Sequence, residues 1–427
     1  MTLLAALAVA VALLATGCGG NGKGSKASGS VSLMAFGDPE ELQAFRNVIS
    51  TFSDKEPDIT VKLIEASDRD DLLARLATGF AAGSPPDLFL INYRFFGQFA
   101  AKGVLEPLQA RLDQSKEFSE SDFYEQALAP FRFRGALQCL PQNISSLVFY
   151  YNRDLFQKAG VAEPAANWTW KEMTDKAGAL TKDVDGDGKI EQYGLGVEPV
   201  LIRLAPFLWS NGANLVKQDL SGFDLGTQAA QEVLDEFLVL RSNYRVIPSE
   251  EEVESEDDEA RFINGRTAMY MDSRRATPGF RKITAFDWDV APLPRFKQPA
   301  TILHSDAYCM TTDSNNKDAA WRFVEFALGA EGQRITAKAG RTVPSLKKVS
   351  TTEAFLDPSA KPANSQVWLD AIENMRNVPS ISTWPEIEDA AEPLLEEAMY
   401  ESENFIASKL AERINARTQK LFVRAAK

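Results

Sequence analysis

The sequence predicts an α/β fold built on a doubly wound, largely parallel sheet. Two observations lead to this prediction. Hydrophobic periods typical of strands and of helices alternate from residue 31 to residue 91, and one short strand, Leu88 to Ile91, is apolar throughout, as a strand covered on both faces must be. The chain has 427 residues, 44% of them hydrophobic, which suffices for two or three domains at ~150 residues each.

The predicted elements alternate between strands and helices. In order, they are a strand over 31–36, a helix over 39–52, a strand over 59–64, a helix over 70–82 and a strand over 88–91. Right-handed crossovers would place the three strands in one parallel sheet with helices on both faces. Ligands of such sheets bind beyond the carboxyl ends of the strands. Four residues follow strands at that edge and are expected near a ligand: Asp38, Asn92, Tyr93 and Arg94.

Three later segments also have interpretable patterns. Residues 146–151 predict another strand, and Thr169 with Glu172 forms the capping-box pattern that begins a helix. Residues 250–259 carry eight acids in ten positions, which indicates a solvated loop and helix start. Residues 387–422 are predicted to be helical.

The amino terminus has the pattern of a bacterial lipoprotein signal. Residues 3–15 are an uncharged apolar run, too short to span ~30 Å of hydrocarbon but typical of a signal-peptide core. Residues 15–18, Ala-Thr-Gly-Cys, resemble a lipobox, which implies that residues 1–17 are removed and that Cys18 carries diacylglycerol. Residues 18–30 would then be a flexible lipidated tether. We therefore expect an extracytoplasmic protein anchored to the bacterial membrane by lipid.

Charge and composition exclude several function classes. The chain has 46 basic and 60 acidic residues, a net charge of −14, so binding to nucleic acid is not expected. His304 is the only histidine, which excludes His-rich zinc sites and leaves one residue for any Ser-His-Asp triad. In an oxidising compartment Cys139 and Cys309 form either a disulfide or two buried thiols, and the sequence leaves both open.

Several phrases, in their order and spacing, carry a resemblance to a known family. They are PDLF at 86–89 with FAAKG at 99–103, LVFYYNRDLF at 147–156, NWTW at 167–170, FINGRTAM at 262–269 and GRTVP at 340–344. The chain resembles the family-1 extracellular solute-binding proteins of ABC importers, of which maltose-binding protein is the best-known member. The resemblance implies two doubly wound α/β lobes joined by a hinge with three crossings, near residues 143–146, 303–308 and 342–346. Lobe one would comprise 31–143 with 306–342, and lobe two 146–303 with 346–427.

The resemblance also implies a ligand site and partners. It adds eight candidate contacts: Asn143 and Ser145 at the first crossing, His304 and Asp306 at the second, and Trp209, Asn211, Arg274 and Trp384 in lobe two. It implies a monomer that needs no cofactor and catalyses nothing, with membrane permease subunits and their ATPase as partners. Aromatic rings cover the C–H faces of sugars, while carboxylates, amides and guanidinium groups bind hydroxyls. We therefore expect a mono- or oligosaccharide ligand.

Two other functions remain open at this stage. A receptor for a glycerophosphodiester or glycerol phosphate would be favoured if Arg94, Arg274 and Arg275 converged, because guanidinium groups bind phosphate bidentately. A surface glycoside hydrolase would need two carboxylates ~5–9.5 Å apart across a cleft, and the sequence contains no hydrolase motif.

Residues 183–191, with the sequence DVDGDGKIE, match the first half of a calcium loop. Asp183, Asp185 and Asp187 would occupy positions one, three and five, the Lys189 carbonyl position seven, and Glu191 position nine. Position twelve is Gly194, so the usual bidentate glutamate is missing. The loop predicts a structural Ca²⁺ site, and the alternative is a turn rich in Asp without metal.

Overall fold

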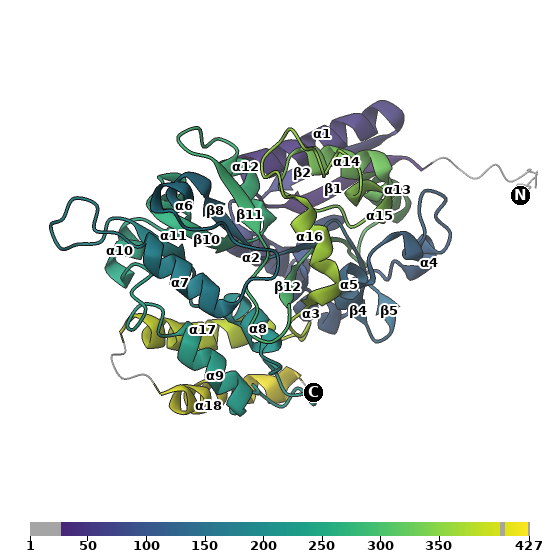
Figure 1. Cartoon of the computed structure of the whole chain (residues 1–427). Coiled ribbons are helices and arrows are strands. Elements are labelled where there is room, and N and C mark those ends of the chain that lie inside the picture. Colours follow the sequence, from purple (N-terminus) through teal and green to yellow (C-terminus); the bar gives the residue numbers. More distant parts are fainter. Residues whose placement is uncertain (1–26, 402–405, 426–427) are drawn as a thin grey trace, which may run out of the picture.

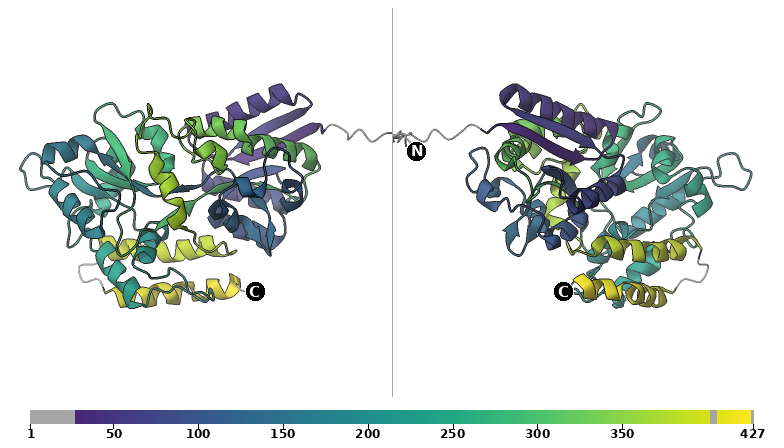
Figure 2. Two further views of the ribbon diagram at one scale, coloured as in Figure 1. Left: turned by 45° about the vertical axis from the view of Figure 1, so that its right-hand side comes forward. Right: turned by 180° about the vertical axis from the view of Figure 1, so that it is seen from behind.

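The computed structural model describes residues 27–401 and 406–425, so the predicted signal peptide and Cys18 lie outside the described residues. The chain forms two lobes that lie side by side. One contains the early strands and helices, and the other contains most of the middle of the chain (Figures 1 and 2). The two-lobed α/β architecture expected from the sequence is therefore confirmed.

The first lobe is built on a five-stranded sheet in the order β2-β1-β3-β13-β6. Its strands are β1 (Gly29–Ala35), β2 (Ile59–Glu65), β3 (Leu88–Asn92), β6 (Cys139–Pro141) and β13 (Asp306–Met310). Its main helices are α1 (Pro39–Lys55), α2 (Arg69–Ala81), α3 (Tyr93–Lys102), α13 (Lys317–Leu328) and α14 (Ala330–Lys338). Strands β1, β2 and β3 are parallel, and β13 is antiparallel to its neighbours. The predicted β-α-β-α-β order is confirmed, with every boundary within three residues.

The second lobe is built on a four-stranded sheet in the order β11-β8-β10-β9. Its strands are β8 (Val148–Asn152), β9 (Tyr193–Gly196), β10 (Thr267–Asp272) and β11 (Trp288–Ala291). Its helices are α6 (Arg153–Ala159), α7 (Trp170–Leu180), α8 (Leu201–Ser210), α9 (Gln228–Phe237), α10 (Glu250–Ser255), α11 (Asp258–Ile263), the short helix η3 (Arg274–Ala276) and α12 (Thr277–Phe280). The predicted capping box begins α7, because Thr169 and Glu172 each bind the other's backbone N–H. The acidic run forms α10 and the start of α11, but Asp258 within it is buried.

A third, smaller sheet lies where the chain passes between the lobes. It consists of β7 (Ser145–Ser146), β12 (Thr301–His304) and β14 (Met375–Arg376) in the order β14-β12-β7. The Ser305 hydroxyl donates to the Asn143 carbonyl at 2.7 Å, and the Ile144 N–H donates to the Val343 carbonyl at 2.9 Å. The three segments predicted as hinge crossings thus lie next to one another, and the lobe boundaries placed around them stay a prediction.

The remaining elements are short, apart from two carboxyl-terminal helices. The short ones are α4 (Gln109–Leu112), η1 (Glu120–Asp122), α5 (Glu125–Leu128), η2 (Ala129–Phe131), β4 (Arg132–Phe133), β5 (Ala136–Leu137), α15 (Lys347–Ser350), α16 (Gln366–Asp370) and η4 (Ile372–Asn374). The long ones, α17 (Trp384–Tyr400) and α18 (Ala407–Ala425), pack side by side (Figure 1), as the predicted helical character of 387–422 requires. Helix α17 also contacts α3 of the first lobe and α8 of the second. Within the described ranges, no helix combines the length and apolar character needed to cross a membrane.

Cys139 on β6 and Cys309 on β13 form a disulfide. The two residues face each other directly across the antiparallel pair, with their Cα atoms 4.5 Å apart. That separation is typical of a non-hydrogen-bonded antiparallel pair. Of the two alternatives that the sequence left open, the structure contains the disulfide.

Candidate ligand site between the lobes

A cavity of about 260 Å³ lies between the two lobes, and we call it the central cavity. Its lining comes from the strand ends of both lobes, from the crossing strands and from nearby helices. The lining residues are Phe36, Arg69, Asn92, Arg94, Phe95, Asn143, Ser145, Ile202, Arg203, Asp272, Ser273, Arg275, His304, Asp306 and Arg341. The volume lies just below the ~300–1,000 Å³ that pockets for drug-sized ligands span. The polar lining suits a small hydrophilic solute, or one end of a larger one.

On the first-lobe side, two amides hold one carboxylate. Asn92 ends β3 and caps α3 by accepting the Arg94 N–H. Its side-chain amide donates to Asp306 at 3.2 Å, and the Asn143 amide donates to the other Asp306 oxygen at 3.1 Å. The Asp306 N–H donates back to the Asn143 side chain at 3.0 Å. Because Asp306 begins β13 and Asn143 precedes β7, this network fixes two crossing segments against each other.

On the second-lobe side, two arginines hold one buried carboxylate. Asp272 ends β10 and is 1% exposed, with Arg203 at 3.0 Å and Arg275 at 2.5 Å. Burial opposes ionisation of this carboxyl, but the two guanidinium groups outweigh it and hold the Asp272 pKa at about 2. Asp272 is therefore ionised at neutral pH. It fixes both arginines at the cavity wall.

Arg94 and Arg341 are also paired with carboxylates. Arg94 donates to both oxygens of Glu388 on α17, at 2.9 and 3.0 Å, and both side chains are largely buried. Arg341 pairs with Glu41 at 2.5 Å and with Asp38. Burial raises the Glu41 pKa to about 7, although Arg341 opposes that rise. Helices α1 and α17 thus supply the carboxylates that orient these two arginines.

His304 lines the central cavity as a neutral imidazole. Burial, together with the neighbouring Arg203 and Arg94, lowers its pKa to about 3. Its Nε2 has no hydrogen-bond partner among the residues the structure describes. Because the ring is neutral at physiological pH, it can donate or accept a hydrogen bond with a ligand, and its charge does not change with pH in that range.

The lining therefore presents charged groups in pairs. Each of its five arginines has a carboxylate partner within ion-pair distance. A paired arginine keeps N–H donors free while its charge is compensated, and its carboxylate keeps acceptor positions. Donors and acceptors set side by side without excess charge suit a solute with many hydroxyl groups.

The sequence profile of the bacterial extracellular solute-binding protein family matches residues 37–334. The chain belongs to this family. A curated relative from Brucella abortus, whose name says only that it is a binding protein, is 28% identical over 353 residues, which cover 81% of this chain and 82% of that one. The mannitol-binding protein of Pseudomonas aeruginosa is 24% identical over 336 residues, covering 74% and 73% of the two chains.

A solved structure has the same fold. It is the ABC substrate-binding protein Lmo0181 from Listeria monocytogenes in complex with cycloalternan, with a TM-score of 0.83 and 25% identity, covering 92% of this chain and 98% of that one. The resemblance stated from the sequence phrases is thus confirmed.

In this solute-binding protein, six of the predicted contacts line the central cavity. They are Asn92, Arg94, Asn143, Ser145, His304 and Asp306. Asp38 is half exposed and pairs with Arg341, which lines the cavity. The structure brings these residues together, and their contact with a ligand stays a prediction.

Three aromatic or amide predictions fall in the interior instead. The Trp209 ring is 3% exposed and lies under the Arg376 guanidinium at 4.8 Å. Asn211 donates to the Ala229 carbonyl and to Glu232, both at less than 3.0 Å. Trp384 is completely buried and donates to Glu388 at 2.8 Å, so it orients the carboxylate partner of a lining arginine. None of the three belongs to the cavity lining of the described chain.

Tyr93 and Arg274 also lie in the interior of the structure. Tyr93 is completely buried, and its hydroxyl accepts the Val378 N–H at 3.3 Å. Arg274 is completely buried between the rings of Phe355 and Trp368, at 4.4 and 4.6 Å. Each is adjacent in sequence to a lining arginine, Arg94 or Arg275. Neighbouring residues point in different directions, and in both pairs the second residue lines the cavity.

Sequence reasoning missed the second-lobe side of the cavity. Asp272 and Ser273 lie at the carboxyl end of β10, so the rule applied to the first lobe would have found them. Arg203 is the single charged residue of the apolar segment 200–209, and a lone arginine in a buried helix needs a partner. Both signals were in the sequence.

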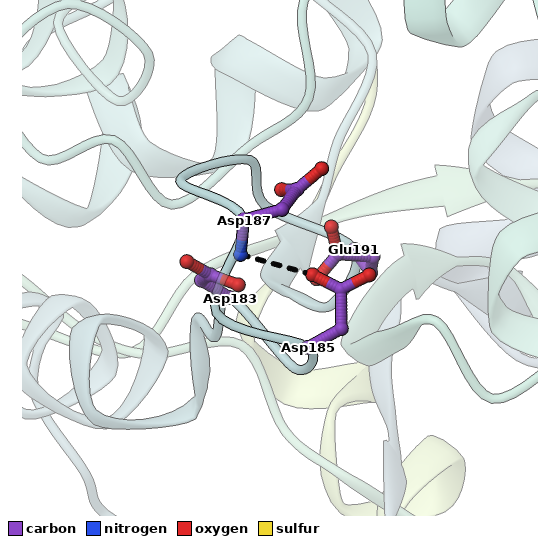
Figure 3. A group of neighbouring side chains, drawn as sticks. All are labelled: Asp183, Asp185, Asp187 and Glu191. Carbon is purple, nitrogen blue, oxygen red and sulfur yellow. Dashed lines mark hydrogen bonds between the residues drawn. The ribbon is translucent and has the colours of Figure 1, made fainter.

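The predicted calcium loop brings its carboxylates together. Asp183, Asp185, Asp187 and Glu191 can place ligand oxygens within 4.8 Å of one another (Figure 3). The same side chains already accept backbone N–H groups: Asp183 binds those of Gly186 and Gly188 at 2.6 and 2.9 Å. The Lys189 N–H donates to Asp187 at 2.8 Å. The donor set fits Ca²⁺, which prefers oxygen ligands.

Proposed function

We propose that this protein is the extracytoplasmic substrate-binding lipoprotein of an ABC importer, which captures a carbohydrate in the central cavity and delivers it to the permease subunits and their ATPase. The observation that carries the proposal is the pairing of all five lining arginines with carboxylates. A neutral polyol gains hydrogen bonds at such a wall without displacing an ion pair. The sugar and polyol ligands named for related proteins agree with this chemistry.

The glycerol phosphate alternative is less well supported. It required Arg94, Arg274 and Arg275 to converge, but Arg274 packs between two rings away from the cavity. Arg94 is bound by Glu388, and Arg275 is bound by Asp272 and Glu259. A phosphate would have to compete with these carboxylates and would meet their repulsion. The arrangement therefore favours a neutral solute over a phosphorylated one.

A thermal-shift screen tests the proposal. Sugars and polyols form one arm, and glycerol phosphate with glycerophosphodiesters forms the other. A ligand at 100 times its Kd stabilises the folded protein by roughly 2.7 kcal/mol. For a chain of this size, that stabilisation raises the melting temperature by a few degrees. A shift with a carbohydrate supports the proposal, and a shift confined to phosphorylated compounds contradicts it.

The proposed role is binding without catalysis. The test is incubation of the protein with labelled oligosaccharides, followed by chromatography. We expect every oligosaccharide to be recovered intact. Cleaved products that persist after removal of contaminating hydrolases would instead support the glycoside hydrolase alternative.

The lipid anchor at Cys18 and the calcium loop are separate parts of the proposal. The change Cys18→Ala should release the protein from the membrane fraction into the soluble fraction, which fractionation and immunoblotting can measure. For the loop, Ca²⁺ should raise the melting temperature of the wild type and leave that of Asp185→Asn unchanged, because the variant lacks one ligand charge. An equal shift in both proteins would place the effect of Ca²⁺ elsewhere.

A further inference from the structure

A second hollow, of about 610 Å³, borders the central cavity on the side of the second lobe. Its walls are the loop before α8, the segment from α10 to α11, the end of β10 and one side of α17. Of its lining residues, seven are acidic and one, Arg275, is basic. We call it the acidic hollow. Two of the acids, Glu198 and Glu259, pair with Arg203 and Arg275. The other five have no ion-pair partner among the residues that the structure describes.

Helix α17 contributes three of these acids, Asp389, Glu392 and Glu396, at positions that repeat every three or four residues. Such spacing places all three on one face of a helix. In the described ranges of the chain, none of the three has an ion-pair partner. Burial and the nearby Glu388 raise the Glu392 pKa to about 7. The Leu201 N–H donates to Glu392 at 3.2 Å. The face of α17 that borders the hollow is thus a row of carboxyl groups without ion-pair partners.

Helix α11 adds Asp258, whose position is unusual for an acid. It is 4% exposed and lines the hollow. Its Oδ1 has no hydrogen-bond partner in the part of the chain that the structure describes. Burial and the neighbouring Glu198 raise its pKa to about 7, although Arg261 opposes that rise. Buried polar atoms without a partner are rare in folded proteins, and a ligand that donates a hydrogen bond here would satisfy this one.

The spacing of the carboxylates favours an organic cation over a metal ion. Among the described residues, the loop at 183–191 is the only place where three or more His, Cys, Asp or Glu side chains are grouped so that they could hold a metal ion. The acids of the hollow do not form such a group, whereas Ca²⁺ needs several oxygens at 2.3–2.6 Å. An ammonium group on a larger molecule can instead contact one or two of them at a time.

Arg275 connects the hollow to the central cavity. It lines both, and it contacts Asp272 in the central cavity at 2.5 Å and Glu259 in the hollow at 2.8 Å. The two cavities are therefore adjacent and share a wall at Arg275. We propose that the acidic hollow binds an ammonium group of the solute, so that the carbohydrate is an amino sugar or an oligosaccharide that carries a basic amine. This inference rests on the proposed function, because it specifies the class of carbohydrate.

Calorimetric titration with two matched trisaccharides tests the inference. One is the trimer of glucosamine, whose amines carry positive charge, and the other is its fully N-acetylated form, which is neutral. At neutral pH and low salt we expect the amine form to bind at least ~10-fold more tightly. The preference should shrink as salt is added, because added ions screen the attraction between exposed charges.

Variants of α17 locate the effect. The triple change D389N/E392Q/E396Q should reduce the ratio of the two trisaccharide affinities to about one, and the single change E396Q should reduce this ratio in part. The matched control is E397Q, which removes the same charge one position along the helix, where Glu397 pairs with Arg413 outside the hollow. The control should keep the full preference. Because E396Q is conservative, it keeps the test valid if the triple variant folds poorly.

Each outcome decides the inference separately from the proposed function. Equal affinity for the two trisaccharides, or tighter binding of the acetylated form, overturns the amine subsite while leaving a carbohydrate receptor in place. A preference that survives in the α17 variants also overturns it. If neither trisaccharide binds, the inference falls, and the proposed function falls with it only if the wider carbohydrate screen is also negative.

Discussion

Removing the charge of Asp272 should destabilise the second lobe by an amount that depends on pH. The Asp272 pKa is lowered from 3.8 to about 2, and a tenfold change in the affinity of a carboxylate for its proton corresponds to ~1.4 kcal/mol. Ionised Asp272 therefore contributes about 2–3 kcal/mol to the free energy of unfolding at neutral pH. Asp272→Asn should lose at least that much, because it leaves Arg203, 4% exposed, without its buried partner.

Urea unfolding at several pH values measures this contribution. A carboxyl whose folded pKa is depressed stabilises the protein above its unfolded pKa and loses that contribution as pH falls through the folded pKa. The difference in the free energy of unfolding between wild type and D272N should thus be constant from about pH 8 to pH 5 and should become smaller below about pH 4.

Asp289→Asn is the matched control, because Asp289 is a buried second-lobe aspartate whose pKa burial raises instead of lowers. The Asp289 Oδ1 accepts two backbone N–H groups, which an asparagine carbonyl can still accept. D289N should cost little at neutral pH. A difference in the free energy of unfolding between wild type and D272N that does not change with pH, or that is below about 0.5 kcal/mol, would refute the ion pair as the source of this stability.

Three further predictions concern buried groups. The Asp258 pKa is raised from 3.8 to about 7, so the folded state keeps a proton that the unfolded state releases, and the free energy of unfolding falls as pH rises from about 4 to 7. In urea unfolding, D258N should therefore be more stable than the wild type at about pH 8, by up to about 4 kcal/mol, and equal to it at about pH 4. The Cys139–Cys309 disulfide closes a loop of 170 residues, so C139A/C309A should lose about 2–5 kcal/mol in the same assay, and a reductant should destabilise the wild type alone. Because His304 has a pKa of about 3, titration calorimetry should find parallel pH profiles of ligand affinity for wild type and H304N between about pH 5 and pH 8, and profiles that diverge near pH 6 would contradict a neutral ring.

The first lobe was predictable because its elements are local. The hydrophobic period and the turn residues within 31–91 predict three parallel strands. Because ligands bind beyond the carboxyl ends of such strands, the prediction then identifies Asn92 and Arg94, which the structure places on the cavity lining. Both signals depend on contacts between residues close in sequence. The same rule would have identified Asp272, which also ends a strand and lines the central cavity.

The direction of single side chains was not predictable in the same way. Tyr93 and Arg94 begin one helix, yet the first is buried against Val378 and the second reaches Glu388 on α17. These partners lie more than 280 residues away, so neither spacing nor composition reveals them. The family resemblance added Trp384 as a candidate ligand contact, whereas packing between helices from distant parts of the chain buries it completely. Tertiary contacts decide which of two adjacent residues faces the cavity.

The most direct test of the central claim is titration calorimetry with the best carbohydrate from the screen, on the wild type and on Ile202→Trp. Ile202 lines the central cavity without a polar group, so a larger side chain fills the space and leaves the paired charges intact. We expect saturable binding at one site of the wild type, weakened at least ~100-fold in I202W, with both proteins folded. Unchanged affinity in I202W would show that the ligand binds outside the central cavity.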